Sequence, residues 1–276
     1  MRRHHAAGVA VLALALSSCG SDGKTVVSPT PAPTTEAAVS PSPTFAASPS
    51  PRPSAAQPAA KSAAPKPRKT AAPRNSSLLV ERLNGVGNAR QVISVVASGY
   101  GTSYATLHAF TKTSSGWDET FGPWSVRIGR RGFAPPGDKR EGDLRTPSGS
   151  YGFQFMFGVR SSPGVRYEYR RVTGDWHVWA DDPGTPRYNL WSDTRVHDAG
   201  PSPEPLNVSA YNYSAVIAYN TARTSGLGSA IFMHVSTGGS TAGCVSLPTG
   251  QLLDVLRWLD PSKAPRIVMG TESYVT

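Results

Sequence analysis

The residues best suited to chemistry are a histidine and a cysteine ten positions apart, His234 and Cys244. A β-type apolar run, residues 230–233, leads into the histidine, and a loop of small residues leads on to the cysteine. A thiol is a strong nucleophile only as its thiolate, and a neighbouring imidazole can take the proton and hold the resulting ion pair. Gly243 has no Cβ, so a substrate carbonyl can approach the sulfur and amide groups can point at it. The pattern predicts a Cys/His site for acyl transfer.

Two other interpretations of this pair stay open. A lone cysteine usually packs as a small apolar side chain, and a lone histidine at a strand end is usually structural. The pair could also join a zinc site, although tetrahedral zinc normally shows closer ligand pairs such as Cys-x-x-Cys, which this sequence lacks. We therefore expect no metal and no organic cofactor.

The first 19 residues predict a lipoprotein-type signal peptide. A basic start precedes an apolar core, residues 6–16, that is too short to span a membrane. The Leu-Ser-Ser-Cys motif ending at Cys19 resembles the bacterial lipobox, in which the cysteine becomes the lipidated first residue of the mature protein. We expect an exported protein, anchored by a lipid on Cys19 to the outer face of the bacterial plasma membrane and reaching into the cell wall. Ordinary secretion is the alternative.

The predicted export bears on how Cys244 is interpreted, as a packed apolar side chain or as a reactive thiol. The chain has two cysteines, and lipidation or cleavage would remove Cys19 from the thiols of the mature protein. A single unpaired cysteine in an oxidising compartment indicates a reactive thiol.

Residues 20–76 predict a disordered, proline-rich linker. They hold 12 of the 25 prolines and otherwise consist largely of Ser, Thr and Ala. Such a segment cannot bury enough apolar surface to offset its chain entropy. We expect it to hold the catalytic domain, residues 77–276, away from the membrane.

The net charge of +10 lies mostly outside that domain. Residues 1–76 carry nine Lys and Arg against two Asp and Glu, whereas residues 77–276 carry 19 against 16. A nearly balanced domain without a recognisable motif gives no reason to expect nucleic acid as a partner. The basic linker is better suited to anionic wall polymers or lipid head groups.

The sequence of residues 77–276 predicts mostly strands with few helices. Short apolar or alternating runs predict strands over residues 91–97, 104–112, 117–128, 151–157, 211–220 and 266–270. One amphipathic helix is predicted over residues 250–259, with four leucines on one face and Thr249 as its N-cap.

Two further segments are ambiguous. Turn signals frame the charged stretch 139–149, and one interpretation of its composition is a solvated loop in which Asp143 and Arg145 satisfy each other. The aromatic residues of the 176–189 stretch fit a polar groove for sugar or peptide, or simply a mixed core and surface.

Taken together, residues 90–270 resemble the L,D-transpeptidase catalytic domain, a YkuD-like fold of bacterial cell-wall enzymes. The similarity rests on several spaced segments in the right order: residues 139–149 with Lys-Arg-Glu-Gly-Asp-x-x-Thr-Pro-x-Gly, 179–189, 211–220, 228–234, 241–244 and 258–261. The resemblance implies a mostly β domain of sandwich or barrel-like type with few helices.

The resemblance also implies roles for individual residues. Cys244 would be the nucleophile and His234 its general base, with the backbone carbonyl of Val235 orienting the imidazole. Backbone amides at Gly243 and Cys244 would receive the oxyanion. We further assign four residues to a substrate groove: Ser236, Thr241, Tyr188 and Asn189.

Two departures from the family pattern affect substrate anchoring. Ala242 stands where many members have histidine, and Ser246 stands where many have arginine or asparagine. The resemblance implies a peptidoglycan L,D-transpeptidase that cross-links stem peptides through a cysteine thioester. An L,D-carboxypeptidase acting on stem peptides, or a non-catalytic wall-binding module, are the alternatives.

Overall fold

The computed structural model describes residues 77–276. The predicted signal peptide, the linker and Cys19 all lie outside the described residues, so they stay predictions. Within residues 77–276, none of the helices has the length and apolar character needed to cross a membrane.

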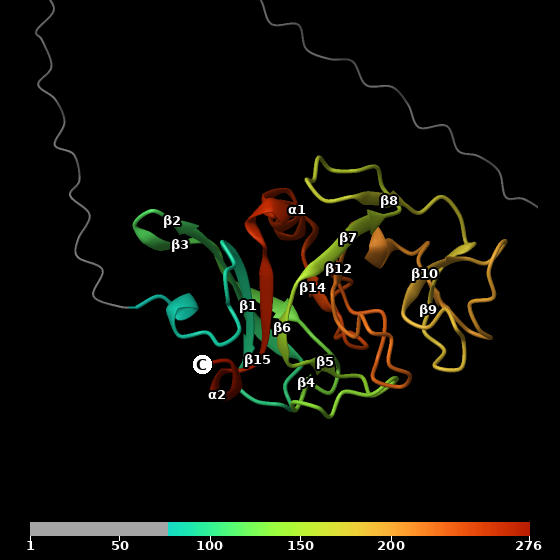
Figure 1. The fold of residues 1–276 in the computed structure, drawn as a ribbon, viewed down its shortest axis with the longest axis horizontal. Coiled ribbons are helices and arrows are strands. Elements are labelled where there is room, and N and C mark those ends of the chain that lie inside the picture. Colours follow the sequence, from blue (N-terminus) through green and yellow to red (C-terminus); the bar gives the residue numbers. More distant parts are fainter. Residues whose placement is uncertain (1–76) are drawn as a thin grey trace, which may run out of the picture. The chain divides into compact units, whose positions relative to one another are not determined.

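Ten strands form one sheet in the spatial order β6-β15-β1-β2-β3-β14-β13-β12-β7-β8 (Figure 1). Their bounds are β1 Gln91–Ala97, β2 Tyr104–Thr113, β3 Gly116–Arg127, β6 Gly149–Tyr151, β7 Phe153–Gly158, β8 Tyr169–Arg171, β12 Ser214–Ile217, β13 Phe232–Val235, β14 Val245–Leu247 and β15 Arg266–Thr271. Strands β6 and β7 lie near opposite ends of this order, yet Gly152 alone separates them in the chain. The sheet must therefore curl until its two ends approach each other.

Smaller elements complete the domain. A three-stranded sheet has the order β10-β9-β11, and β4 pairs with β5 in parallel. Their bounds are β4 Phe133–Ala134, β5 Thr146–Pro147, β9 His177–Ala180, β10 Leu190–Asp193 and β11 Glu204–Pro205. The helices are α1 Thr249–Trp258 and α2 Glu272–Val275, with short 3-10 turns η1 Leu79–Glu81, η2 Ser209–Tyr211 and η3 Pro261–Lys263.

Helix α1 fills the inside of the curled sheet. Figure 1 shows it between the β1/β15 side and the β7/β8 side of the domain. Its apolar face is fully buried in a core shared with side chains from eight strands of the large sheet. Each such side chain contributes about 1.5–3 kcal/mol of hydrophobic stabilisation. The helix therefore holds the curl together.

Strand β13 has two buried faces. Met233 and Val235 point towards the core that contains α1. Phe232 packs in a second core beneath the three-stranded sheet, and His234 contacts the aromatic ring of Tyr211 on that same side. Because side chains alternate along a strand, this arrangement directs His234 away from α1.

The predicted strands agree with the structure for the most part, and the prediction of a mostly β fold with few helices is confirmed. The prediction of a strand over 211–220 was too long, because Tyr211 and Asn212 donate backbone hydrogen bonds to Val208 and Ser209 in η2. The predicted strand 151–157 is interrupted at Gly152, where the chain passes from β6 to β7.

The helix prediction was close but assigned the wrong cap. Helix α1 begins at Thr249, and Pro248 occupies the N-cap position without a side-chain hydrogen bond. The four-residue helix α2 was not predicted, since so short a segment carries no helical periodicity.

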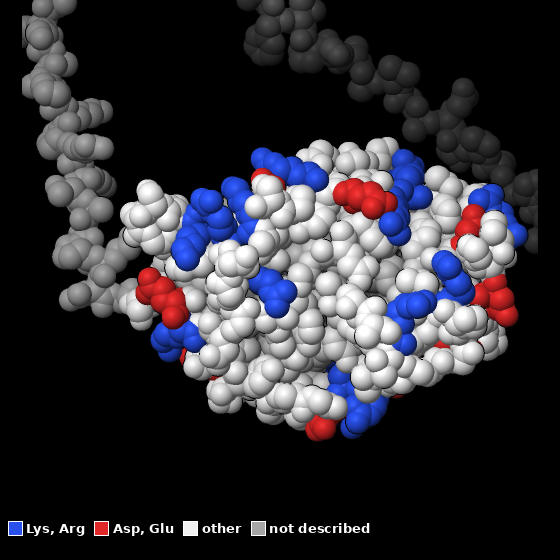
Figure 2. Space-filling view, viewed as in Figure 1, with Lys and Arg blue, Asp and Glu red and all other residues white. Residues whose placement is uncertain are grey.

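Basic and acidic side chains are interspersed on the face that Figure 2 shows. This distribution agrees with the nearly balanced charge of residues 77–276, where 19 Lys and Arg stand against 16 Asp and Glu. No large area of this face carries charge of one sign alone.

Candidate active site

The two residues of the predicted catalytic pair line one pocket of about 370 Å³. Strands β13 and β14 are parallel neighbours, with His234 in register with Ser246, two residues beyond Cys244. Both are nearly inaccessible, with exposed fractions of 7% for His234 and 6% for Cys244. Residues ten positions apart in the chain are thus brought to adjacent strands.

The imidazole of His234 has a defined orientation and tautomer. Its Nδ1 lies 2.8 Å from the carbonyl oxygen of Val235, the contact that the family resemblance implied. A carbonyl only accepts, so Nδ1 carries the proton and Nε2 keeps its lone pair in the neutral ring. Burial lowers the pKa of His234, although the Val235 carbonyl opposes this shift. The histidine is therefore a neutral base at pH 7.

The thiol of Cys244 does not contact this base directly. Its Sγ donates to the carbonyl of Ala230 at 3.2 Å and accepts from the amide of Phe232 at 3.3 Å. Among the hydrogen bonds of residues 77–276, none joins Cys244 to His234. Burial raises the pKa of Cys244 well above its ordinary value, and nearby Glu204 raises it further. The resting pair is thus a neutral thiol and a neutral imidazole, whereas the sequence suggested an ion pair.

The backbone that receives the thiol is held by Asn189. The side-chain oxygen of Asn189 accepts from Trp179 Nε1 at 2.9 Å and from the Ala230 amide at 3.2 Å. Its amide nitrogen donates to the carbonyls of Tyr219 and Asn220 at 3.1 and 2.9 Å. Ala230 itself adopts a left-handed conformation, with φ of 53°. Such a conformation is costly for alanine, so the four bonds of Asn189 help to maintain it.

Of the four residues predicted for a substrate groove, only Thr241 lines the pocket. Tyr188 and Asn189 are buried beneath it, where the Tyr188 hydroxyl accepts from the Gly228 amide at 3.0 Å. The Ser236 hydroxyl accepts from the Gly238 amide at 3.1 Å in the loop that follows β13. Tyr188 and Asn189 thus support the pocket wall from behind.

Thr241 connects the predicted oxyanion amides to the loop. Its hydroxyl donates to the Cys244 carbonyl at 2.7 Å and accepts from the Gly243 amide at 3.2 Å. Gly243 is tightly packed, because a Cβ there would lie 3.0 Å from the Arg145 carbonyl oxygen and 3.1 Å from Ile231 Cδ1. Because the Gly243 amide already donates to the Thr241 hydroxyl, this hydrogen bond would have to break before the amide could donate to an oxyanion.

The charged motif at residues 139–149 is not simply a solvated loop. Asp143 accepts from Lys139 Nζ at 2.7 Å and from the backbone amides of Arg140 and Arg145. Asp143 and Arg145 do meet, but through the Arg145 backbone amide at 2.9 Å, whereas the Arg145 guanidinium donates to the Phe133 carbonyl at 3.0 Å. These bonds shape a compact turn that lines the pocket.

Three carboxylates in the pocket were missed from the sequence: Glu141, Asp181 and Glu204. Glu141 lies in the charged motif and accepts from the hydroxyls of Tyr188 and Ser229. Glu204 begins the two-residue strand β11 between two prolines, in a stretch that shows no recognisable pattern. The family resemblance carried a signal for the other two, because Glu141 lies in its segment 139–149 and Asp181 in its segment 179–189.

Glu204 is the most strongly perturbed of the three. Burial raises its pKa to about 7; a hydrogen bond from Tyr211 opposes the shift, while Asp181 and Glu141 add to it. The Tyr211 ring in turn meets the His234 ring edge-on, with 5.3 Å between their centroids. Glu204 is therefore linked to His234 through Tyr211, which bonds to the one and contacts the other. The negative charge of Glu204 also raises the pKa of the Cys244 thiol.

The aromatic residues of the 176–189 stretch mostly form core, which favours the second of the two interpretations given above. Trp179 is 2% exposed and packs with Phe155 and Phe232, and Cys244 belongs to the same cluster. Among residues 77–276, no group of three or more His, Cys, Asp or Glu side chains has the arrangement of a metal site.

Comparison with known proteins supports the resemblance. A family model described as YkuD, the L,D-transpeptidase catalytic domain, matches residues 114–271, more than half of the chain. No curated protein sequence matches significantly.

Among solved structures, the helical cell shape determining protein Pgp2 from Campylobacter jejuni is 15% identical, with a TM-score of 0.34. The match covers 70% of this chain and 54% of that chain, so this chain spans about half the length of Pgp2. By the family model, which includes both His234 and Cys244, the chain belongs to the YkuD family of L,D-transpeptidase catalytic domains.

Proposed function

We propose that the chain is a peptidoglycan L,D-transpeptidase in which Cys244 is the nucleophile and His234 the general base. The observation that carries the proposal is a neutral imidazole, fixed through Nδ1 by Val235, in one pocket with the sole thiol of residues 77–276. An imidazole in this state is suited to take a proton at Nε2. The family membership supports a cysteine-dependent reaction.

The first half of the reaction begins with movement of the thiol. Substrate binding would turn Sγ away from the Ala230 carbonyl and towards His234 Nε2, which takes the proton. The thiolate attacks the amide carbonyl at the L-centre of a diamino acid in a stem tetrapeptide. The bond to the terminal D-Ala breaks, the protonated His234 gives its proton to the leaving amine, and a thioester on Cys244 remains.

The second half returns the enzyme to its resting state. An amine of a neighbouring stem attacks the thioester carbonyl, and His234 takes a proton from that amine. A peptide bond forms, the C–S bond breaks, and the proton returns to Sγ. If water replaces the amine, the same steps give an L,D-carboxypeptidase.

The oxyanion would be received by the backbone amides of Gly243 and Cys244. The Gly243 amide is at present engaged with Thr241 at 3.2 Å, a long and replaceable contact. A developing negative charge is a stronger acceptor than a hydroxyl, so this exchange would favour the transition state.

The decisive experiment separates the three outcomes in one assay. Full-length protein is incubated with a stem tetrapeptide, with and without an amine acceptor, and analysed by mass spectrometry. Cross-linked product supports the transpeptidase, free tripeptide in the presence of acceptor supports the carboxypeptidase, and absence of any Cys244 adduct supports a non-catalytic wall-binding module.

We also propose export and anchoring through a lipid on Cys19, which the lipobox-like motif supports. Two acyl chains would hold the protein stably, whereas one chain alone gives only marginal binding. Mass spectrometry of the mature N-terminus tests this. A lipid-bearing Cys19 supports the proposal, and a free N-terminus beyond residue 19 in membrane-derived protein contradicts it.

A further inference from the structure

A second and larger hollow, of about 660 Å³, lies where the two ends of the curled sheet approach each other. We call it the seam groove. Its walls come from the β6–β7 connection, the segment before β8, the start of β15 and the stretch 85–88. It shares no lining residue with the pocket of His234 and Cys244. Its volume lies within the range of ligand sites, about 300–1,000 Å³.

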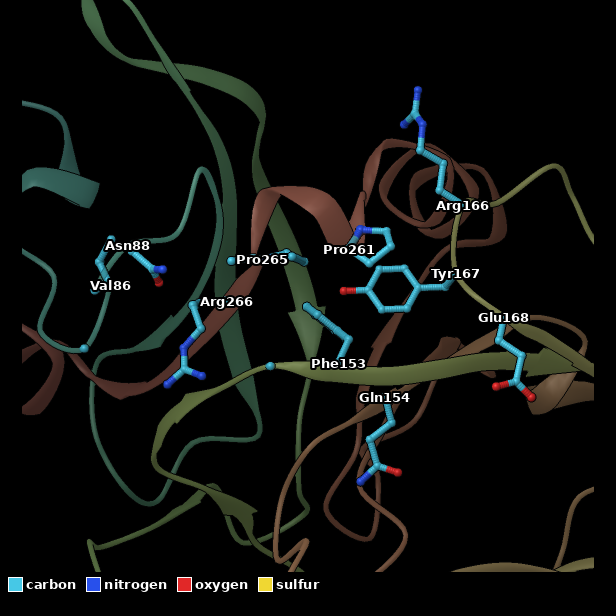
Figure 3. A pocket seen from close by; sticks show the side chains of 14 residues that line it. Val86, Asn88, Phe153, Gln154, Arg166, Tyr167, Glu168, Pro261, Pro265 and Arg266 are labelled. Atoms are coloured by element: carbon cyan, nitrogen blue, oxygen red, sulfur yellow. The ribbon is translucent and has the colours of Figure 1, made fainter.

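An aromatic ring with an uncommitted hydroxyl forms one wall of the seam groove. Tyr167 packs edge-on to Phe153, with 6.4 Å between ring centroids, and Figure 3 shows its hydroxyl pointing into the space between Phe153 and Pro265. Burial raises the pKa of Tyr167 to about 12, so the hydroxyl stays a proton donor. Within residues 77–276, no protein group accepts from it.

Two side-chain amides among the lining residues have no internal partners, Asn88 and Gln154. Figure 3 shows Asn88 pointing in from the wall opposite Tyr167, whereas Gln154 points away from Phe153 and Tyr167, on the other side of β7. Neither amide makes a hydrogen bond within the described part of the chain. Each amide offers both a donor and an acceptor, which suits the hydroxyl and acetamido groups of a sugar.

The groove also carries positive charge. Arg266 donates to the hydroxyl and carbonyl of Ser150 at 3.2 and 3.1 Å, and Nη1 of its guanidinium takes no part in either bond. Arg166 is already engaged, because its Nη1 donates to the Arg257 carbonyl at 3.2 Å and its Nε lies 3.8 Å from Asp260; Figure 3 shows its guanidinium pointing away from Tyr167. The acidic residue of the groove, Glu168, pairs with Arg170 instead, at 2.7 Å. A guanidinium group binds carboxylates through short, charge-assisted hydrogen bonds.

Added peptide strands fit this groove poorly. A peptide is usually captured by main-chain pairing at a sheet edge. The segment 261–265, which lines the groove before β15, offers no such edge: Pro261 and Pro265 have no N–H to donate, and Ala264 is left-handed, with φ of 47°. A sugar needs no such ladder, because it stacks its C–H face on an aromatic ring and bonds through its hydroxyls.

We propose that the seam groove binds an amino-sugar glycan that carries free carboxylates. Its identity as a peptidoglycan strand rests on the proposed function, and the carboxylates are those of sugars without a stem peptide, because a stem is joined to its sugar as an amide. Tyr167 stacks on a sugar ring, Asn88 bonds to its hydroxyl or acetamido groups, and Arg266 binds a carboxylate. A strand held here would raise the effective concentration of the stem peptides on its other sugars at the Cys244 pocket.

The test uses full-length protein with Cys244→Ala, so that no chemistry takes place, and peptide-free glycan fragments as the probe. Calorimetric titration in about 150 mM salt should give saturable binding, since this salt screens exposed charges beyond about 8 Å. Tyr167→Ala should weaken binding about tenfold and Asn88→Ala about threefold, as expected for one lost ring contact and one lost hydrogen bond. Neutral chitin fragments should bind more weakly than the carboxylate-bearing glycan.

Two controls keep the test sharp. Tyr104→Ala removes another exposed tyrosine, 57% exposed on β2 and absent from the groove lining, and should leave glycan binding unchanged. Tyr167→Phe keeps the ring and removes only the hydroxyl, so it tests the groove even if Tyr167→Ala does not fold. Thermal unfolding of both variants would reveal a folding defect.

Three results would overturn the proposal. The first is equal glycan affinity in the parent protein and both Tyr167 variants. The second is binding that salt abolishes and Tyr167 does not influence, which would assign it to the basic residues 1–76. The third is binding of stem peptide alone. Each leaves the proposed acyl transfer untouched, because that is read from the adduct on Cys244.

Discussion

The Cys244 pocket and the seam groove differ in how their polar groups are used. Around Cys244, the thiol, the His234 ring nitrogen Nδ1 and the Gly243 amide each already bond within the protein. In the seam groove, the Tyr167 hydroxyl and the Asn88 amide have no internal partner in the described part of the chain. Groups that do chemistry must be held in position beforehand. Groups that bind a ligand are instead left free for it.

The two sites also differ in their charge. Three carboxylates line the Cys244 pocket, namely Glu141, Asp181 and Glu204. Two guanidinium groups line the seam groove, against one carboxylate that pairs elsewhere. An anionic strand would thus be attracted to the groove and repelled from the pocket. The comparison predicts different consequences for equivalent substitutions in the two regions.

The largest effect is expected for the nucleophile. Cys244→Ala should abolish the covalent adduct with an acyl-donor peptide or a carbapenem, a loss of about three orders of magnitude or more in turnover. Cys244→Ser should fall nearly as far, because a hydroxyl is a poorer nucleophile with one imidazole as its base. Intact-protein mass spectrometry measures the adduct. An adduct that persists in Cys244→Ala would remove this residue from the mechanism.

The base comes next. His234→Ala should slow acylation at pH 7 by about 10²–10⁴-fold. Activity should recover partly as the pH rises, but only in the alkaline range, because burial raises the pKa of Cys244. Stopped-flow acylation rates across pH 6–10 provide the measurement. Full activity of the variant at pH 7 would point to another base; His197 is exposed and does not line the pocket.

The pH dependence should depend on Glu204. Its carboxyl group is neutral below its pKa of about 7 and anionic above, and it faces Tyr211, Asp181, Glu141 and Cys244. Its ionisation should hinder formation of the thiolate, so acylation should decline above pH 7. Glu204→Gln mimics the neutral form and should run faster than the parent at pH 8, by about tenfold for each unit of pKa change at the thiol.

Glu204→Ala serves as the matched control for this prediction. It removes both the charge and the acceptor of Tyr211, so it should lose the alkaline decline and also slow acylation through a less ordered His234 ring. Identical pH profiles for the parent and Glu204→Gln would show that this carboxyl group does not control the thiol.

Stability offers a complementary test of Glu204. A carboxyl group whose pKa is raised on folding binds its proton more tightly in the folded state. Stability therefore falls as the pH rises from the unfolded value of about 4.5 through the folded value of about 7. Glu204→Gln should be more stable than the parent at pH 8 by about 3 kcal/mol, and the difference should vanish near pH 4. Urea unfolding at the two pH values checks this, and an equal difference at both would contradict it.

The smallest effects come from a pair of asparagines, one in each region. Asn189→Ala leaves the Ala230 amide and the Trp179 indole without their acceptor, so it should cost about 2–3 kcal/mol of unfolding free energy. Asn88→Ala removes an exposed, unpartnered amide and should change stability by no more than about 0.5 kcal/mol. Chemical denaturation of both variants makes the comparison. Equal costs would mean that the two regions do not differ in how their polar groups are held.

Much of the fold could be read from local pattern. Strand β1 has the predicted bounds, and β2 and β3 differ from the prediction by about one residue at their ends, because alternating and apolar runs specify strands directly. Strands β1, β2 and β3 pair in chain order as an antiparallel meander, which their short turns predict. The pairing of the later strands was not predictable, since β6 and β7 are neighbours in the chain yet lie near opposite ends of the sheet order.

The sequence by itself determined the family and the mostly β class and pointed to the candidate Cys/His pair, because these depend on residue types at short and recognisable spacings. Only the tertiary structure decided that the Cys244 thiol donates to the Ala230 carbonyl and that Tyr211 links Glu204 to His234. The seam groove, too, is a feature of the tertiary structure alone. These features join residues up to about 180 positions apart, such as Asn88 and Arg266 in one groove. Burial and charge at such sites depend on long-range packing, which no local pattern records.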